Sequence, residues 1–487
     1  MIRRAGTRRG VPDHPRRFAI HLCFDIHRSP EPDSFGVVGS VSAPTIRLSI
    51  MMFLEFAVWG AWAVLIAKHM SNLGFTGVQI NSVYLTTAIG AMLSPLIAGW
   101  IADRFLPNQI FTGAVHLVGG VLLFIAWQQK TFAGVWTVIF LYAILYMPTI
   151  ALTNAIAFYH MKDSKKFGYI RVWGTLGWIA INWSLSVYLR YWEQRSPGVS
   201  HVGDCLPAAG IVSLLLGLYC FTLPNTPPAK GAKNPYAFLE AIKLTSNANF
   251  AVLLVISFVV AIELPFYYNL TYLFLTAPAG VGLQESTANL AMSLGQVGEV
   301  FLMLLVAPSL RHLGMRATIF LGILAWPVRY AIFAIGHPWW LIVAAQTLHG
   351  ICYSFFFVGG MIAVERLSQK DIRASAQGLI VFATNGVGML FGSLLAGWVS
   401  DTFVDPAGNR QWPKIFLVPI VVTVLAAIAF RALFSERKFQ EDSSRIERDS
   451  AAARPCPGCG YNLVGIESAL CPECGMPIAA GVPPTTV

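Results

Sequence analysis

The sequence Ser293-Leu-Gly-Gln-Val-Gly-Glu-Val300 lies in the middle of a long apolar run. Gln296 and Glu299 are three residues apart, so on a helix they share one face. Gly295 and Gly298 have the same spacing and allow a neighbouring backbone to approach closely. A carboxylate near the middle of a bilayer costs about 2.5 kcal/mol or more, so it normally faces a polar cavity. This face therefore predicts the wall of a solute pathway; the alternative is a protonated Glu299 bonded to a neighbouring helix.

The composition is typical of an integral membrane protein. Of the 487 residues, 55% are hydrophobic and 12% are charged, against about 25% charged in an average soluble protein. Basic residues gather at the N-terminus and between the apolar runs, so the net charge of +10 implies no nucleic-acid partner. The apolar runs carry no nucleophile–base pair, catalytic metal motif or phosphate loop, so we do not expect an enzyme.

Twelve apolar runs approach the length of about 20 residues that a bilayer core requires. They cover 47–68, 78–102, 109–128, 134–159, 169–189, 206–223, 248–275, 287–309, 316–335, 338–363, 375–400 and 413–434. The longest connection, 224–247, contains four prolines and three lysines and divides the runs into six plus six. We therefore expect an all-α membrane protein with twelve transmembrane helices in two six-helix bundles.

Loop charges predict the orientation of these spans. With the N-terminus inside, the inner loops hold twelve Lys and Arg residues and the outer loops hold six. Positive charge is retained on the cytoplasmic side, so both termini are expected in the cytoplasm. Residues 1–45 are rich in Arg and Pro, lack a spanning run and are expected to be disordered.

A faint internal repeat supports a two-bundle layout. Leu96-Ile-Ala-Gly-Trp-Ile-Ala-Asp-Arg-Phe105 closes the second run, and Leu394-Leu-Ala-Gly-Trp-Val-Ser-Asp-Thr-Phe403 closes the eleventh. A fold built from helix triplets in alternating orientation places two such segments in this way. Convergent small-residue packing before a helix-ending Asp is the alternative. Two halves of six spans with a basic middle loop are the layout of the major facilitator superfamily, whose bundles rock around a midplane site.

The fifth span carries a polar stripe. Arg171, Thr175 and Trp178 are spaced four and three apart, so they share one helical face. A cation, a hydroxyl and an indole suit a flat polar ligand, through hydrogen bonds at its edge and stacking on its face. The alternative is that Arg171, near the inner end, extends to the lipid headgroups.

Three other spans carry titratable residues that are candidates for proton coupling. Glu55 lies in the first span, and Glu263 lies mid-way along the seventh, two residues before Pro265, which can kink the helix. His349 and Tyr353 lie one turn apart in the tenth span. His349 can act as a proton carrier or stay a neutral group that is hydrogen-bonded to a neighbouring helix.

Several stretches, in order over about residues 46–434, carry a family resemblance. They are Phe53–Trp62, Tyr146-Met-Pro-Thr149, Asn154, Ile170-Arg-Val-Trp-Gly-Thr-Leu-Gly177, Ser293 with Gln296 and Glu299, Ala325-Trp326 with Arg329, Ile372-Arg-Ala-Ser-Ala-Gln-Gly378 and Thr384-Asn-Gly386. In these stretches the chain resembles the bacterial nucleoside:proton symporters of the major facilitator superfamily. The resemblance implies a monomeric, multi-pass transporter of the bacterial inner membrane, with nucleosides and protons as partners.

The resemblance also implies a binding site between the two halves. Arg171, Thr175 and Trp178 would line its N-terminal side, although the family more often has Phe where Trp178 stands. Gln296 and Glu299 would face the nucleoside from the C-terminal half and bind its base or ribose.

Two departures from the family pattern leave the substrate and the coupling open. The seventh helix usually offers Gln and Asn, and those positions are Pro265 and Tyr268 here. The tenth helix usually carries a Tyr and then a Phe-Asp pair, and those positions are His349, Tyr353 and Ser354 here, so a carboxylate is missing. The residues that could carry the coupled proton are Glu299, Glu55, Glu263 and His349.

The tail contains two Cys-x-x-Cys pairs separated by eleven residues. The four cysteines are Cys456, Cys459, Cys471 and Cys474. Two such pairs at this separation are typical of a four-thiolate site for structural Zn²⁺, and the small module resembles a zinc ribbon. Two disulfides are the alternative, which a reducing cytoplasm disfavours.

These observations predict seven parts of the chain. They are a basic N-terminal extension at 1–45, a six-helix bundle at 46–223, a linker at 224–247, a six-helix bundle at 248–434, a charged linker at 435–453, the zinc-ribbon-like module at 454–478 and a tail at 479–487. Nucleoside uptake driven by protons through alternating access is the leading function. The alternatives are transport of another small polar solute, such as a sugar or organic ion, and a membrane sensor without transport that signals through the zinc ribbon.

Overall fold

The computed structural model describes residues 43–97, 106–161, 167–227, 241–369 and 372–452, together with 470, 476 and 477. These described residues are almost entirely helical, apart from isolated bridges such as the one between Val404 and Arg410. The predicted disorder of the N-terminal extension falls almost wholly outside the described residues, as do all four tail cysteines.

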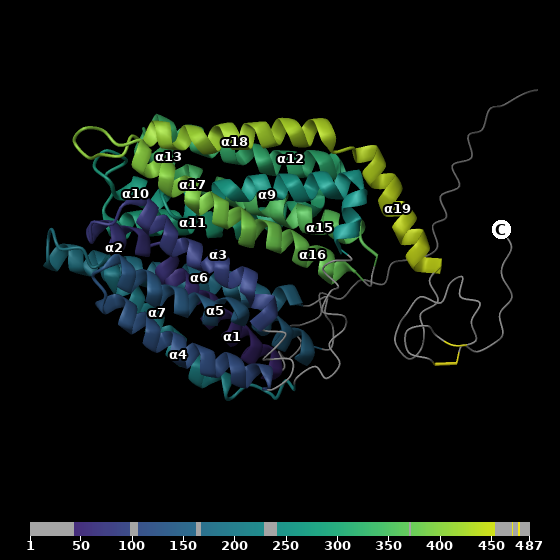
Figure 1. The fold of residues 1–487 in the computed structure, drawn as a ribbon, viewed down its shortest axis with the longest axis horizontal. Helices are drawn as coiled ribbons and strands as arrows, with labels where there is room; N and C mark the ends of the chain where they lie inside the picture. Colours follow the sequence, from purple (N-terminus) through teal and green to yellow (C-terminus); the bar gives the residue numbers. More distant parts are fainter. Residues whose placement is uncertain are drawn as a thin grey trace, which may run out of the picture. The chain divides into compact units, whose positions relative to one another are not determined.

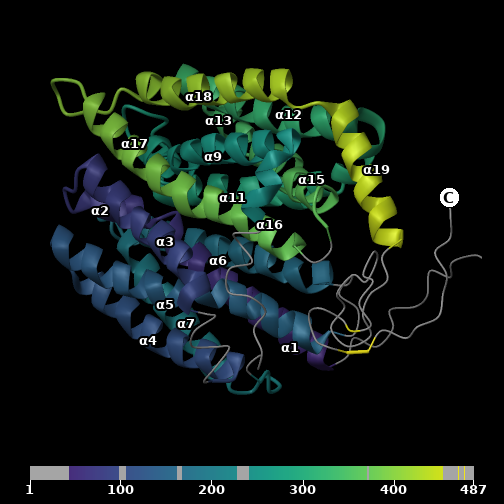
Figure 2. The same ribbon diagram turned by 45° about the vertical axis from the view of Figure 1, so that its right-hand side comes forward.

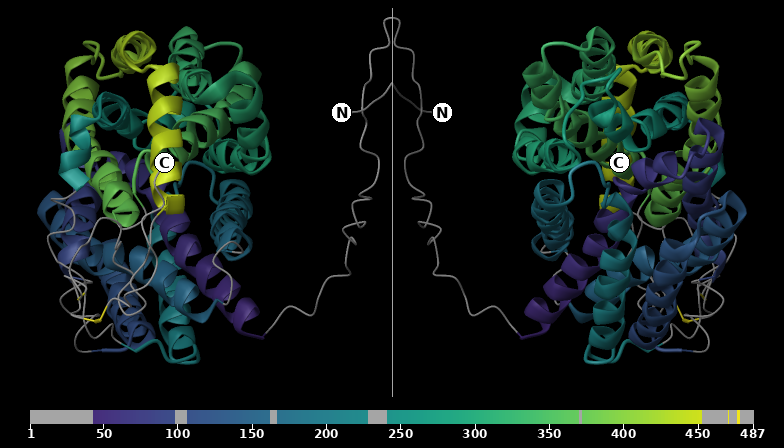
Figure 3. Two further views of the ribbon diagram at one scale, coloured as in Figure 1. Left: turned by 90° about the vertical axis from the view of Figure 1, so that its right-hand side faces the viewer. Right: turned by 90° about the vertical axis from the view of Figure 1, so that its left-hand side faces the viewer.

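The helices form two bundles, each built from one half of the chain (Figure 1). The first contains α1 (Ala43–Ala63), α2 (Ile66–Asn72), α3 (Gly77–Ile97), α4 (Asn108–Gln128), α5 (Phe132–His160), α6 (Phe167–Arg195) and α7 (Cys205–Cys220). The second contains α9 (Ala248–Tyr268), α10 (Thr271–Thr276), α11 (Glu285–Met303), α12 (Val306–Ile335), α13 (Trp339–Ala345), α14 (Leu348–Ile351), η5 (Cys352–Val358), α15 (Gly359–Arg366), α16 (Arg373–Val381), η6 (Phe382–Gly388), α17 (Met389–Thr402) and α18 (Trp412–Leu433). Figure 3 views both bundles along their helices.

Nine of the described helical segments are long and apolar enough to cross a membrane. Each of them coincides with a span that the sequence predicts. Helices α3, α6 and α11 occupy the other three predicted spans. The bundles meet through these helices, since α3 packs on α17 and α6 packs on α11.

The predicted eighth span, 287–309, is wrong at its end. Helix α11 stops at Met303, and a new helical stretch begins at Val306. Gly314, with φ 82°, then turns the chain into the main part of α12 in a conformation that favours glycine. The hydroxyls of Ser309 and Thr318 lie 2.8 Å apart and tie the two stretches together, so this segment is a connection rather than the end of a span.

Close helix contact at α11 depends on glycine, as the sequence predicts. A Cβ placed on Gly298 would lie 2.9 Å from the carbonyl oxygen of Thr347, and a Cβ on Gly295 would lie 3.2 Å from the Cβ of His349. Because Gly295 and Gly298 have no Cβ, the backbones of α11 and α14 can come into contact. This contact fixes the height and rotation of the α11 face that carries Gln296 and Glu299.

Three spans are interrupted near their middle. Pro265 lies inside α9, which ends at Tyr268 before the chain restarts as α10. The spans of residues 339–366 and 373–402 each contain a π-helical turn, η5 and η6. Such turns alter the rotation of the residues that follow and are frequent at functional sites. Tyr353 lies inside η5, so its direction differs from that expected on an ideal helix.

The predicted charged linker at 435–453 is instead a helix, α19 (Glu436–Ala452). It leaves α18 at a steep angle (Figure 2) and packs against α12 and α15. Phe439 is buried and lies with its ring centroid 5.7 Å from that of Phe434. The Glu436 carboxylate accepts hydrogen bonds from the backbone amides of Met315 and Arg316. Charged residues on its solvent face concealed the apolar stripe that docks this helix on the second bundle.

Candidate functional site

The α11 face places its three polar residues between the bundles. Ser293 accepts a hydrogen bond from the indole nitrogen of Trp183 on α6, at 2.9 Å. Gln296 and Glu299 follow along the same face and are half-buried. The Glu299 carboxylate makes no hydrogen bond or ion pair with another described residue, so it can receive a ligand. This arrangement does not match the alternative in which a neighbouring helix satisfies Glu299.

The predicted α6 stripe faces α11 from the first bundle. The guanidinium carbon of Arg171 lies 4.0 Å from the ring centroid of Phe56 on α1, a cation–π contact that fixes the side chain. Arg171 is half-buried and lies within electrostatic reach of Glu299 and Tyr353 of the second bundle. Arg171 therefore packs against α1 through Phe56, and its place in a ligand pocket stays a prediction.

Trp178 and Thr175 complete this side. The Trp178 ring meets Trp59 edge-on, with centroids 5.9 Å apart, and Thr175 is half-buried beside them. Trp178 also packs against Gly60, where an added Cβ would lie 3.0 Å from the indole. Small and aromatic residues of α1 thus set the position of the stripe.

The predicted residues of the second bundle form an aromatic cluster next to α11. The His349 ring stacks on Tyr267, with centroids 4.8 Å apart, and its Nε2 lies 3.3 Å from the hydroxyl of Tyr268. The Tyr353 ring lies 6.2 Å from that of His349. His349 is buried, whereas Tyr268 and Tyr353 are partly exposed. The structure therefore brings all three predicted residues together. Of the three, the two tyrosines keep part of their surface exposed.

Arg329 lies behind this cluster and carries an unpaired charge. Its side chain is 0% exposed, and its guanidinium carbon lies 3.9 Å from the centroid of Tyr267. Its Nη1 lies 3.5 Å from Nδ1 of His349, while Nε and Nη2 have no hydrogen-bond partner among the described residues. Glu263 accepts a hydrogen bond from Tyr330 and forms no ion pair with Arg329. This polar layer supports the cluster from within the bundle, and Glu263 does not reach the face of α11.

Glu55 lies inside the first bundle and has a partner that sequence analysis missed. Its Oε2 is 2.9 Å from Nε2 of His116 on α4. Its Oε1 accepts a hydrogen bond from the hydroxyl of Thr149, at 2.8 Å. His116 stands alone in an apolar run, and this polar residue was the only available signal for the pair.

Hydrogen bonds between the bundles gather at one end, which we call the closed end; it contains the α2–α3, α6–α7 and α17–α18 connections. Glu193 on α6 accepts hydrogen bonds from the backbone amide and hydroxyl of Ser286, at the start of α11. Asp401 on α17 accepts hydrogen bonds from the backbone amides of Gly77 and Val78, at the start of α3. Each bundle thus places a carboxylate on a helix N-terminus of the other, where the helix dipole favours negative charge.

Replacing both carboxylates by amides, as Glu193→Gln with Asp401→Asn, is expected to open the closed end. A carboxylate at a helix N-terminus contributes about 0.3–1 kcal/mol, so losing two shifts the population roughly tenfold. Spin labels at Val199 and Ala407 measure the separation by electron resonance. Asp405→Asn is the control, because Asp405 bonds only within its own turn. An unchanged distance distribution in the double variant contradicts the prediction.

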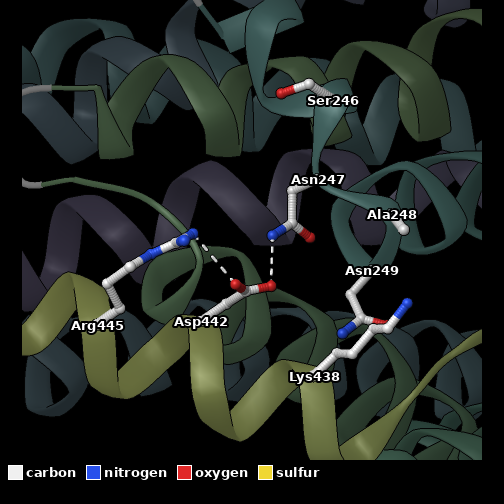
Figure 4. A pocket seen from close by; sticks show the side chains of 7 residues that line it. All are labelled: Ser246, Asn247, Ala248, Asn249, Lys438, Asp442 and Arg445. Carbon is white, nitrogen blue, oxygen red and sulfur yellow. Dashed lines mark hydrogen bonds and ion pairs between the residues drawn. The ribbon is translucent and has the colours of Figure 1, made fainter.

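Two described hollows lie away from this face. One, of about 340 Å³, is lined by α19 and the start of α9, where Asp442 bonds Asn247 and Arg445 (Figure 4). The other, of about 630 Å³, lies at the closed end and includes Lys68 and Glu285. Neither contains a predicted binding residue, so the candidate site rests on the facing side chains and not on a closed cavity.

Two helical bundles with nine long apolar helices among the described residues, packed on each other through α3 with α17 and α6 with α11, have the architecture of a membrane transporter of the major facilitator type. The chain belongs to the nucleoside H⁺ symporter family, whose family model matches residues 43–439. The family and the all-helical fold are those that the sequence predicts, whereas the count of twelve spans and the zinc ribbon stay predictions.

Relatives match most of the chain. It is 34% identical over 406 residues to YegT of Escherichia coli strain K12, covering 80% of this chain and 94% of that protein. It is 30% identical over 408 residues to the nucleoside permease NupG of the same strain, covering 80% of this chain and 95% of NupG. The crystal structure of the nucleoside transporter NupG matches with a TM-score of 0.71 and 28% identity, over 81% of this chain and all of that one.

Proposed function

We propose that this protein takes up nucleosides together with protons by alternating access. The observation that carries the proposal is that Arg171 of one bundle and Glu299 of the other are half-buried and form no ion pair with a described residue, in a chain of this family. A charge from each side can bind a polar ligand only when both bundles contact it. Relatives described as nucleoside permeases supply the substrate class.

The proposed roles follow the chemistry of each side. Arg171 and Thr175 donate hydrogen bonds to the ligand, and Trp178 stacks on its base. Gln296 and Glu299 bind the base or ribose from α11. The remaining contacts come from the tyrosines and histidine of the aromatic cluster, Tyr268, His349 and Tyr353. Glu299, Glu55, Glu263 and His349 are the proposed candidates for the coupled proton.

The proposal includes the membrane arrangement predicted from the sequence. Twelve spans, in two bundles of six, would cross the bacterial inner membrane with both termini in the cytoplasm. Loop charge supports this orientation. The closed end then faces outward, and the site is reached from the cytoplasm. One chain contains both sides of the site, which supports a monomer.

Uptake of labelled uridine and adenosine into proteoliposomes, with and without an imposed pH gradient, tests the proposal. We expect accumulation only with the gradient. No uptake of any nucleoside removes the substrate assignment, and uptake that ignores the gradient removes the coupling. A thermal-shift screen of nucleosides against sugars and organic ions tests transport of another solute, which Pro265 and Tyr268 in α9 favour.

The tail is proposed to bind one structural Zn²⁺ through Cys456, Cys459, Cys471 and Cys474. Each pair is followed by a glycine, Gly460 or Gly475, which permits the tight turn around the metal. All four ligands are thiolates, so no position stays open for catalysis.

Deleting residues 450–487 is expected to leave nucleoside uptake unchanged, because both sides of the site lie outside the tail. Metal analysis of the purified full chain is expected to find about one zinc per chain, and none after Cys456→Ser with Cys471→Ser. Loss of uptake in the deleted protein would instead favour a sensor or regulatory role for the tail.

A further inference from the structure

Glu55 and His116 form a closed hydrogen-bond network inside the first bundle. Both side chains are buried, at 0% and 2% exposure. The network joins four helices: Glu55 comes from α1, His116 from α4, Thr149 from α5 and Ser213 from α7. It is separate from the α11 face, and none of its side-chain atoms contacts the second bundle in the contacts described.

Ser213 fixes the tautomer of His116. The Ser213 hydroxyl donates to the backbone carbonyl of His116 at 2.8 Å, which uses its single hydrogen. Its oxygen also lies 3.1 Å from His116 Nδ1, and while the hydrogen points to the shorter contact this oxygen accepts from Nδ1. Nδ1 therefore carries a hydrogen in this arrangement.

The hydrogen on Nδ1 determines how many protons the contact between His116 Nε2 and Glu55 requires. With a hydrogen on Nδ1, a neutral imidazole presents a lone pair at Nε2. A lone pair facing a carboxylate oxygen at 2.9 Å is repulsive, so the contact requires at least one further proton. The proton lies on the carboxyl group beside a neutral imidazole, or on Nε2 as an imidazolium beside a carboxylate. Its loss leaves a carboxylate and a neutral imidazole that repel each other.

We propose that Glu55 and His116 together bind the transported proton and that the conformation described is the proton-loaded one. The inference rests on the proposed symport and assigns its proton site to the first bundle rather than to Glu299. Release of the proton breaks the contact between α1 and α4, which couples proton binding to helix packing.

Helix α1 connects this pair to the ligand-binding side. Phe56, next to Glu55 in sequence, carries the Arg171 guanidinium on its ring. The Tyr146 hydroxyl donates to the backbone carbonyl of Glu55 at 2.8 Å, and the Tyr146 ring lies 6.3 Å from Trp59, which touches Trp178. A shift of α1 therefore moves both Arg171 and Trp178. Around the pair, the Tyr146 ring of α5 meets the His116 ring edge-on with centroids 5.7 Å apart, Tyr142 stacks on Tyr146, and Cys220 of α7 is buried nearby; Arg171 of α6 is the charged group on the neighbouring ring of Phe56.

The first test compares Glu55→Gln with wild-type protein in proteoliposomes. We expect the variant to lose accumulation driven by a pH gradient, and to lose proton influx during nucleoside entry, while gradient-free nucleoside counterflow persists. Thr153→Val is the matched control, because buried Thr153 bonds only backbone carbonyls of its own helix. A wild-type ratio of proton to nucleoside influx in Glu55→Gln overturns the proposal and leaves the nucleoside function intact.

The second test needs neither transport nor a folded Glu55 variant. Nitrogen NMR of the full chain, labelled with ¹⁵N-histidine in lipid nanodiscs, reports the protons on each imidazole, and His116→Asn identifies the His116 signals. We expect a protonated Nδ1 that changes in Ser213→Ala. A neutral His116 with a bare Nδ1 overturns the proposal, even if wild-type protein transports no nucleoside and the proposed function itself fails.

Discussion

Glu299→Gln abolishes concentrative nucleoside uptake and weakens nucleoside binding by roughly 10- to 100-fold. A hydrogen bond to a charged group contributes about 1.5–3 kcal/mol, and each 1.4 kcal/mol is a factor of ten in affinity. Glu299 has no protein hydrogen-bond partner among the described residues, so its substitution leaves no buried donor unpaired and the fold should be retained. Calorimetric binding and uptake in proteoliposomes measure the two effects.

Glu299→Gln and Glu55→Gln are expected to differ in their effects on gradient-driven uptake and on counterflow. Loss of a ligand contact reduces both gradient-driven uptake and counterflow, whereas loss of a proton site reduces only the first. Glu365→Gln serves as the control, because Glu365 is exposed and its ion pair with Arg373 at 3.3 Å contributes little to stability. Undiminished accumulation by Glu299→Gln contradicts the assigned role.

Gly350→Ala disrupts the binding side through the backbone. A Cβ at this position would lie 2.5 Å from the carbonyl carbon of Gly298 and 2.6 Å from the backbone nitrogen of Glu299. Neither atom belongs to a flexible side chain, so α14 and α11 must separate. Overpacking of this kind costs about 1–3 kcal/mol, and here it also displaces the carboxylate. We expect a lower thermal unfolding temperature together with loss of nucleoside binding.

Gly378→Ala is the matched control for this variant. It lies in α16, and an added Cβ would meet nothing within 4 Å. Alanine there should be neutral or stabilise the helix by up to about 1 kcal/mol. Equal stability of the two variants contradicts the close packing of α11 on α14.

The sequence predicts the helical fold well because the bilayer imposes a length and a polarity that single runs reveal. The predicted boundaries of the spans are wrong where local contacts, and not hydropathy, determine where a helix ends. Helix α11 stops at Met303 inside an apolar run that hydropathy does not divide, and α19 hides its buried Phe439 among charges. Both errors involve connections at the ends of spans, where the lipid no longer constrains the chain.

Spacing predicts the candidate binding face, since Arg171 and Glu299 belong to stripes that a helix aligns, and that these residues bind a ligand stays a prediction. The partner of Glu55 was not predictable, because 61 residues separate it from His116 and only the packing of α1 and α4 against α5 and α7 brings them together. The same holds for Glu193 and Asp401. Three of their four partners are backbone amides, which carry no residue-specific signal, and the fourth is the Ser286 hydroxyl.

The backbone donors to Glu193 and Asp401 affect which substitutions the two contacts tolerate. Since the main chain supplies the donors at Gly77, Val78 and Ser286, substitutions there leave the amides in place, and only proline removes one. Val78 can vary as long as it keeps its amide, whereas Gly77 cannot, because an added Cβ would lie 2.6 Å from Oδ1 of Asp401. Methods that search for paired substitutions would overlook these backbone hydrogen bonds between the two bundles. Proline substitutions at the donor positions would reveal them, because proline removes the amide hydrogen.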